Sequence, residues 1–278
     1  RMVEAGVNWL QTDLPEEVLG QCLWRSMRPR PVGLAVHRGT VRYAPENTMP
    51  AFQKAIRLGA DFAECDVRTT ADGRFFLLHD ADLQRTTDGQ GSILEHTADQ
   101  IAALDAGRWF GRSYRGVGVP SFDAFLEIMR GSETQIYLDA KDIAPEALAT
   151  ALQRHGLVDK TVVYQSTDYL ARLRAVAPAL RRMPPLGDAE EIDLLVERVA
   201  PYAFDVRWDI LSAALIEQCH QLGVKVFSDA LWRHETVEDY LQAMEWGIDV
   251  IQTDHPVRVM RAAELWKARQ TTSAAPLR

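Results

Sequence analysis

The sequence is poor in three features that would each define a class of protein. It holds only three cysteines, Cys22, Cys65 and Cys219, without the short paired spacing of a disulfide framework or a zinc knuckle. It has no apolar run of about 18 residues for a transmembrane helix, and its first residues lack the pattern of a signal peptide. Basic residues are in deficit, since the net charge is −8. We therefore expect no nucleic-acid partner, because binding nucleic acid favours a basic surface, and no stable membrane insertion, because insertion needs a long apolar run.

Few cysteines favour a reducing compartment, so we expect a cytoplasmic location. A signal peptide upstream of Arg1 would change that expectation. Residues Gly6–Pro15 are similar to residues Gly247–Pro256, which lie 241 positions further along the chain. Two explanations stay open: a chance match, or the end of a preceding similar barrel in a tandem protein. We divide the chain into an N-terminal extension at 1–32, a barrel at 33–268 and a flexible tail at 269–278.

Short apolar runs alternate with amphipathic helical stretches along most of the chain. This alternation indicates a parallel sheet with helical crossovers, and no Gly-x-Gly-x-x-Gly motif argues for an open nucleotide-binding sheet. About eight strands predict an α/β fold, a (β/α)8 TIM barrel. The expected strands are 33–36, 61–67, 75–78, 135–139, 161–165, 202–206, 224–228 and 250–253.

Residues 81–119 interrupt this alternation. The segment is polar and rich in turn residues, and it is too long for an ordinary loop between a strand and a helix. We expect a small insertion after an early strand, which shapes the substrate pocket. Residues Leu104–Phe110 supply aromatic and basic side chains to cover the mouth of that pocket.

Acidic residues stand at the ends of two expected strands. Glu64 and Asp66 are two residues apart, so both point to the same face, and Asp139 ends a later strand. Three carboxylates suit a hard cation such as Mg²⁺ or Ca²⁺, whereas Zn²⁺ would favour more nitrogen or sulfur ligands. Alone, the pair Glu64 and Asp66 is more typical of a solvated strand end or of a salt bridge with Arg68, and the other motif residues favour the metal site.

Two histidines, His37 and His79, end expected strands and should lie at the carboxyl rim of the barrel. Phosphodiester cleavage needs a base for the attacking oxygen and an acid for the leaving oxygen, and histidine titrates near neutrality. Arg38 offers a planar fork to phosphate oxygens, and Lys141 adds a second positive charge. Arg207, at another strand end, is a further candidate for holding a phosphate or a substrate hydroxyl.

The chain resembles the glycerophosphodiester phosphodiesterase family over roughly residues 33 to 260. The resemblance includes His37-Arg38-Gly39, Pro45-Glu46-Asn47-Thr48, Glu64-Cys65-Asp66-Val67, Leu78-His79-Asp80, Leu83-Gln84-Arg85-Thr86-Thr87, Ala106-Gly107-Arg108-Trp109-Phe110, Leu138-Asp139-Ala140-Lys141 and Ile251-Gln252-Thr253-Asp254.

This resemblance implies a TIM barrel that hydrolyses glycerophosphodiesters to an alcohol and glycerol 3-phosphate, with a small-molecule phosphodiester as its substrate. By position, His37 and His79 are similar to the acid/base pair of the family, and Arg38 to its phosphate binder. Glu64, Asp66 and Asp139 are similar to its ligands for one divalent ion, Mg²⁺ or Ca²⁺, with Mn²⁺ as a third choice. Two alternatives stay open: a phospholipase-type phosphotransferase that releases a cyclic phosphate, and a barrel that binds phosphate esters without catalysis.

Two positions depart from the family pattern. Asp139 stands where many members carry glutamate, so a ligand is one methylene shorter. Ser228-Asp229 stands where many members carry tryptophan in a Trp-Thr context. If Asp229 faces the pocket, it favours a polar or cationic alcohol such as choline, ethanolamine or a sugar. The alternative is that Asp229 caps the helix that follows.

Overall fold

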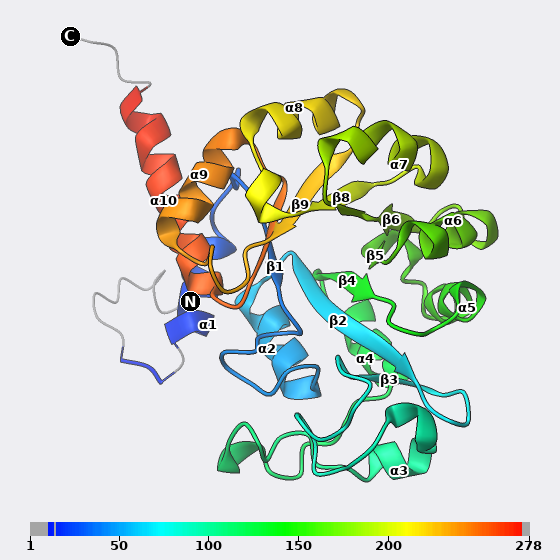
Figure 1. Ribbon diagram of the computed structural model, residues 1–278. Helices are drawn as coiled ribbons and strands as arrows, with labels where there is room; N and C mark the ends of the chain where they lie inside the picture. The colour runs from blue at the N-terminus through cyan, green and yellow to red at the C-terminus, as the bar shows by residue number, and fades with distance from the viewer. Residues whose placement is uncertain (1–10, 14, 274–278) are drawn as a thin grey trace.

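The computed structural model describes residues 11–13 and 15–273, and its centre is a parallel sheet that curves into a nearly closed barrel. Helices surround the strands, as Figure 1 shows. Nine strand segments follow one another in the order β6-β5-β4-β2-β1-β10-β9-β8-β7. The predicted TIM barrel is therefore confirmed.

The strands are β1 (Gly33–Val36), β2 (Phe62–Thr69), β3 (Phe75–Leu77), β4 (Gln135–Asp139), β5 (Thr161–Tyr164), β6 (Arg181–Met183), β7 (Pro185–Leu186), β8 (Ala203–Val206), β9 (Lys225–Asp229) and β10 (Val250–Thr253). The α-helices are α1 (Pro15–Leu19), α2 (Met49–Leu58), α3 (Ala98–Ala102), α4 (Phe122–Arg130), α5 (Pro145–His155), α6 (Thr167–Val176), α7 (Ile192–Val199), α8 (Ala213–Gln221), α9 (Val237–Trp246) and α10 (Pro256–Ser273). None of the helices in the described part of the chain combines the length and apolar character needed to cross a bilayer.

One strand of the predicted eight is wrong. Residues 75–78 do not join the barrel, because β3 pairs antiparallel with the far end of β2, outside the parallel path. The remaining strand of the barrel is formed instead by two short segments, β6 and β7, which Pro184 separates. This strand is joined to β8 by backbone hydrogen bonds, in which the N–H of Tyr202 donates to the carbonyl oxygen of Arg182 (2.9 Å) and that of Asp205 to the carbonyl oxygen of Pro184 (3.0 Å).

Residues 81–119 are more ordered than the expected polar loop. They include α3 and two turns of 3₁₀-helix, Ile93–Glu95 and Arg112–Tyr114. Apolar side chains of this insertion, of β3 and of the residue after β3 form their own buried cluster, which comprises Phe76, Leu78, Leu83, Ile93, Ile101, Ala106 and Val119. The segment lies at one edge of the molecule, beside the β2–β3 hairpin (Figure 1).

The N-terminal extension packs onto the barrel in its described part. Helix α1 contacts α2 and α10, and the Trp24 side chain is fully buried in the main core. The similarity between Gly6–Pro15 and Gly247–Pro256 falls largely on residues 6–10 and 14, outside the described residues. Whether it reflects a preceding barrel stays a prediction. Helix α10 continues through Ser273, so the predicted tail begins inside this helix.

Candidate active site

An apolar layer fills the inside of the barrel, and a polar layer lies directly above it. The apolar layer is the cluster Ala35, Phe62, Tyr137, Val162, Met183, Ala203, Phe227 and Val250. Since side chains on a strand alternate between faces, the residue two positions later points the same way. That rule generates the pairs Ala35–His37, Phe62–Glu64, Tyr137–Asp139, Val162–Tyr164, Ala203–Asp205, Phe227–Asp229 and Val250–Gln252. The second members form one cavity at the carboxyl ends of the strands.

The loop after β1 is held in an unusual backbone conformation. Arg38 and Asn47 have positive φ angles of 47° and 53°, which cost non-glycine residues roughly 1 kcal/mol or more. The backbone N–H of Arg38 donates to Glu64 Oε2 (2.6 Å), and the Asn47 amide donates to Asp66 Oδ2 (2.7 Å). Gly39 has φ of 85°, and a Cβ there would lie 2.7 Å from that of Ala51. The loop is thus fixed against the acidic end of β2.

The three predicted carboxylates are largely buried, with Lys141 beside them. Its Nζ lies 3.1 Å from Asp66 Oδ1 and 2.5 Å from Asp139 Oδ2. Burial, together with the charges of Asp66 and Asp139, raises the pKa of Glu64 well above its ordinary value. Burial and Asp66 also raise the pKa of Asp139. Burial alone would raise the pKa of Asp66 as well, but Lys141 and neighbouring cations outweigh it and lower that pKa.

Burial and mutual repulsion therefore make the charged forms of Glu64 and Asp139 costly. The donor atoms of the cluster are carboxylate oxygens, which suit a hard divalent cation. Within the described residues, no three His, Cys, Asp or Glu side chains are already arranged as a metal-ligand set. The metal prediction stays a prediction.

Each predicted histidine pairs with an aspartate through Nδ1. His37 Nδ1 lies 2.8 Å from Asp254 Oδ1, and His79 Nδ1 lies 2.6 Å from Asp80 Oδ1. A carboxylate at Nδ1 orients the imidazole and leaves Nε2 for another partner, an arrangement typical of histidines that transfer protons. His79 does not end a barrel strand as predicted; it follows β3, and the Arg68 guanidinium holds its carbonyl oxygen (2.7 and 2.9 Å).

Arg85 connects the two histidine-bearing loops. It donates two hydrogen bonds of 2.8 Å to Glu46 and one of 2.5 Å to Asp80. The hydrogen bond from Arg85 lowers the pKa of Asp80 to about 2. Glu46 in turn accepts from Arg38 (2.8 Å). The positions of Arg38 and of the His79–Asp80 pair are therefore coupled through a single guanidinium.

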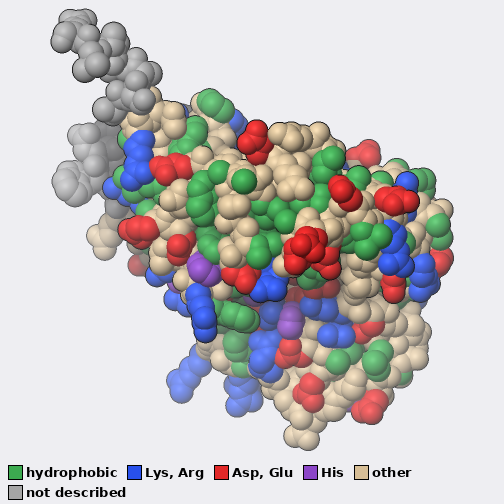
Figure 2. Space-filling model, turned by 45° about the horizontal axis from the view of Figure 1, so that its top comes forward, with side chains coloured by type: hydrophobic (Ala, Val, Ile, Leu, Met, Phe, Trp, Pro, Cys, Tyr) green, Lys and Arg blue, Asp and Glu red, His purple; other side chains and the backbone are tan. Residues whose placement is uncertain are grey.

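One cavity of about 180 Å³ brings together seven of the eight predicted site residues. It is lined by His37, Arg38, Glu64, Asp66, His79, Tyr137, Asp139, Lys141, Tyr164, Asp205, Asp229, Leu231, Trp232 and Gln252. Figure 2 shows acidic, basic and histidine side chains gathered around the hollow in the middle of this face. Arg38 Nε is buried and lies 3.6 Å from Asp66, without a hydrogen-bond partner among the described residues.

Arg207 is the predicted residue that the structure does not bring into this cavity. It is largely exposed, forms an ion pair with Asp209, and lines an adjacent hollow of about 320 Å³. Residues Leu104–Phe110 do not line the cavity either. The aromatic side chain at its lip is Trp232, which is 86% exposed.

Asp80, Gln252 and Asp254 stand in the motifs that carry the family resemblance but had no predicted role, and Asp205 was not singled out at all. Asp254 and Asp80 hold the histidines, and Asp205 and Gln252 line the cavity. The two-residue alternation from the apolar layer would have identified Asp205 and Gln252. Asp229 does line the cavity. It does not cap α9, because Thr236 occupies that position and accepts the backbone N–H of Asp239.

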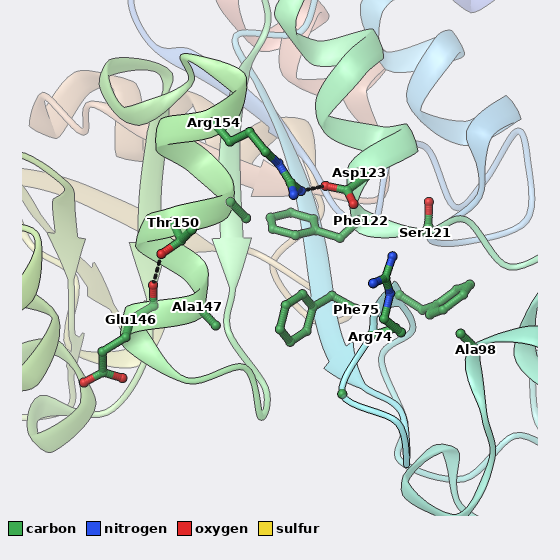
Figure 3. A pocket seen from close by; sticks show the side chains of 13 residues that line it. Arg74, Phe75, Ala98, Ser121, Phe122, Asp123, Glu146, Ala147, Thr150 and Arg154 are labelled. Atoms are coloured by element: carbon green, nitrogen blue, oxygen red, sulfur yellow. Dashed lines mark hydrogen bonds and ion pairs between the residues drawn. The ribbon is translucent and has the colours of Figure 1, made fainter.

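A larger hollow of about 490 Å³ lies elsewhere, between β3 and helices α4 and α5 (Figure 3). Its walls include the rings of Phe75 and Phe122, with Arg154 paired to Asp123 at one side. None of the predicted site residues lines it, and its described lining holds no histidine. It offers no acid/base pair for phosphodiester chemistry.

Comparison with known proteins identifies the family of this chain. The family model for the glycerophosphoryl diester phosphodiesterase family matches residues 37–258. The chain belongs to this family. It is similar to a glycerophosphodiester phosphodiesterase of Caldanaerobacter subterraneus subsp. tengcongensis, with 30% identity over 229 residues, 79% of this chain and 93% of the relative. The predicted family membership is confirmed.

Solved structures of the family share the fold. The glycerophosphodiester phosphodiesterase of Agrobacterium tumefaciens superimposes with a TM-score of 0.76 at 30% identity, covering 83% of this chain and 99% of that one. A phosphodiesterase of Oleispira antarctica superimposes with a TM-score of 0.76 at 23% identity, covering 84% and 96%. That structure contains the product sn-glycerol-3-phosphate.

Proposed function

We propose that this member of the family hydrolyses glycerophosphodiesters to an alcohol and glycerol 3-phosphate, with His37 and His79 as the acid/base pair and with one divalent metal ion. The observation that carries the proposal is that both histidines, each paired with an aspartate at Nδ1, line one cavity with Arg38. The product bound by the Oleispira antarctica phosphodiesterase supports the choice of substrate.

Arg38 and Lys141 hold the phosphate in this mechanism. Arg38 lines the cavity, and its Nε, which lies 3.6 Å from Asp66, makes no hydrogen bond in the described structure, so the guanidinium has hydrogen-bonding capacity left for a phosphate oxygen. Lys141 lines the same cavity and adds a positive charge that favours the transition state over the ground state. Glu46 accepts a hydrogen bond from the Arg38 guanidinium and so holds that group in position.

The histidines move the protons. One imidazole removes a proton from water as its oxygen bonds to phosphorus, and the other protonates the alcohol oxygen as the bond between phosphorus and that oxygen breaks. The products are glycerol 3-phosphate and the free alcohol, so one water is consumed for each diester. Asp254 and Asp80 fix the tautomer of each ring by accepting its Nδ1 proton.

The carboxylates Glu64, Asp66 and Asp139 would hold the metal ion, Mg²⁺, Ca²⁺ or Mn²⁺. Their donor atoms are all oxygen, and burial with mutual repulsion leaves the cluster in need of a cation. Held by these carboxylates, a divalent cation would supply positive charge to the phosphate and so polarise phosphorus. Asp139 is shorter than glutamate, which makes metal affinity the property most sensitive to this position.

The test is a coupled assay that detects glycerol 3-phosphate, with glycerophosphoethanolamine as substrate and with Mg²⁺ or EDTA. We expect His37→Ala and His79→Ala each to lower kcat by about 10²–10⁴, which is the usual contribution of acid/base catalysis. His220→Ala is the matched control, because His220 pairs with Asp249 at the opposite end of β10. Full activity of either cavity variant, or of the wild type in EDTA, would contradict the proposal.

A further inference from the structure

The catalytic cavity continues into the neighbouring hollow. Tyr164, Asp205 and Asp229 line both the cavity of about 180 Å³ and the hollow of about 320 Å³, so the two share a wall. A phosphodiester has two halves, and the proposed function places its phosphate beside Arg38 and the histidines. The adjacent hollow is therefore in position to hold one of the two halves.

The shared wall is acidic, and Arg207, the arginine that lines the outer hollow, is already paired. Asp205 and Asp229 are both carboxylates on neighbouring strands, β8 and β9. Arg207 forms an ion pair and a hydrogen bond with Asp209, which lines the same hollow. Its charge is therefore satisfied locally and does not balance the two carboxylates. The hollow favours a cationic group over a neutral or anionic one.

Aromatic rings face the same space. Tyr164 lines both hollows, and Trp208 lines the outer one, where its ring stacks on His234 with centroids 5.4 Å apart. Trp232 stands at the lip of the catalytic cavity with φ of 71° and an 86% exposed side chain. Aromatic faces attract ammonium groups, and they do so most strongly beside carboxylates in a partly desolvated site.

A third feature is a buried hydrogen-bond acceptor in the catalytic cavity. Gln252 is only 7% exposed, and its Oε1 has no hydrogen-bond partner among the described residues. It lines the catalytic cavity, and on the sheet it stands in register with Asp229. A buried acceptor of this kind is normally satisfied, so its position next to Asp229 indicates a donor supplied from the cavity.

We propose that this acidic and aromatic hollow binds the alcohol half of the substrate and selects glycerophosphodiesters whose alcohol carries an amine cation, of the ethanolamine or choline type. The inference rests on the proposed function for the position of the phosphate. Asp205 and Asp229 act as specificity-determining residues, and Gln252 accepts an N–H of a primary ammonium. It follows that Gln252 discriminates between ethanolamine and choline, since a quaternary ammonium has no N–H to donate.

The first experiment compares kcat/KM for glycerophosphoethanolamine, glycerophosphocholine and the neutral glycerophosphoglycerol. We expect the wild type to prefer the cationic diesters by about tenfold or more, in line with one desolvated cation contact. Asp229→Asn and Asp205→Asn should reduce this preference several-fold, mainly through KM. Glu217→Gln, which removes an exposed carboxylate on α8, should leave the preference unchanged. Gln252→Leu should weaken the preference for ethanolamine over choline.

The outcomes separate this inference from the proposed function. Equal kcat/KM for all three diesters would overturn the inference while the hydrolase stands. No turnover of any diester would overturn the proposed function. In that case, tryptophan fluorescence of the wild type titrated with ethanolamine, choline or glycerol still decides: saturation by the cations alone supports the inference, and no saturation overturns it. A thermal melt of each variant shows whether it is folded.

Discussion

Glu64→Gln should stabilise the protein without metal and weaken the rise in Tm that metal produces. Glu64 is 4% exposed and accepts the backbone N–H of Arg38 at 2.6 Å. Glutamine has the same shape and keeps that acceptor, so the substitution changes little except the charge. Asp66 and Asp139 both repel this charge, so its loss relieves a buried repulsion.

The size of the effect depends on pH with a definite sign. Burial and its two acidic neighbours raise the pKa of Glu64 above the ordinary value of 4.5, so the folded protein binds the proton more tightly than the unfolded chain. The charged carboxylate therefore costs stability, and the cost grows as pH rises from 4.5 through the folded pKa. Removing an uncompensated buried charge is worth about 1–3 kcal/mol, or roughly 2–4 °C in Tm for each kcal/mol in a domain of similar size.

Adding metal should reverse which of the two proteins, wild type or variant, has the higher Tm. A ligand at 100 times its Kd stabilises the folded state by about 2.7 kcal/mol, so saturating Mg²⁺ should raise the Tm of the wild type by several degrees. The glutamine variant lacks one charged ligand and should show a much smaller rise. In EDTA the variant should melt above the wild type, and in excess Mg²⁺ below it.

Thermal melts followed by circular dichroism give the Tm of both proteins in EDTA and in Mg²⁺. Glu217→Gln is the control for the change in net charge. Repeating them at about pH 5 should shrink the advantage of the variant in EDTA, because the wild-type carboxylate takes up its proton. An equal Mg²⁺ shift in both proteins, or a variant that is less stable in EDTA, would refute the reasoning about the carboxylate cluster.

Two further predictions concern the groups that hold the histidines. Asp254→Asn should lower kcat by about 10²–10⁴ with little change in KM, because His37 loses the partner that fixes its tautomer; steady-state kinetics tests this, and an unchanged kcat would exclude the role. Arg85→Ala should lower kcat by about tenfold or more and make activity more sensitive to salt, because Glu46 and Asp80 lose their common donor; wild-type kcat in this variant would show that the two loops hold their positions independently.

The fold was predictable where strands are apolar and was missed where they are not. The barrel strand made of β6 and β7 begins with Arg181 and Arg182 and is interrupted at Pro184, so the sequence shows no apolar run there. Arg182 is buried, and its guanidinium is satisfied by backbone carbonyl oxygens, including those of Leu180 and Val199. These hydrogen bonds form only in the folded barrel, so a local sequence pattern does not reveal that Arg182 is buried. The antiparallel β3, by contrast, resembles a barrel strand in composition alone.

The candidate site divides in the same way. His37, Glu64 and Asp66 stand within 30 residues of one another and carry an ordered motif, so their convergence could be predicted. Asp254 reaches His37 only because β10 pairs with β1 when the barrel closes. Contacts of this kind, between residues 217 positions apart, follow from the sheet order and not from any local pattern.

Phosphorus NMR of the wild-type protein with glycerophosphoethanolamine tests the central claim most directly, because it resolves the diester, a cyclic phosphate and glycerol 3-phosphate in one spectrum. With Mg²⁺ or Ca²⁺, the account predicts that the diester signal is replaced by that of glycerol 3-phosphate, and that EDTA, His37→Ala or His79→Ala each prevents this. Accumulation of a persistent cyclic phosphate would instead establish a phosphotransferase, and an unchanged diester with every metal would contradict catalysis at this site.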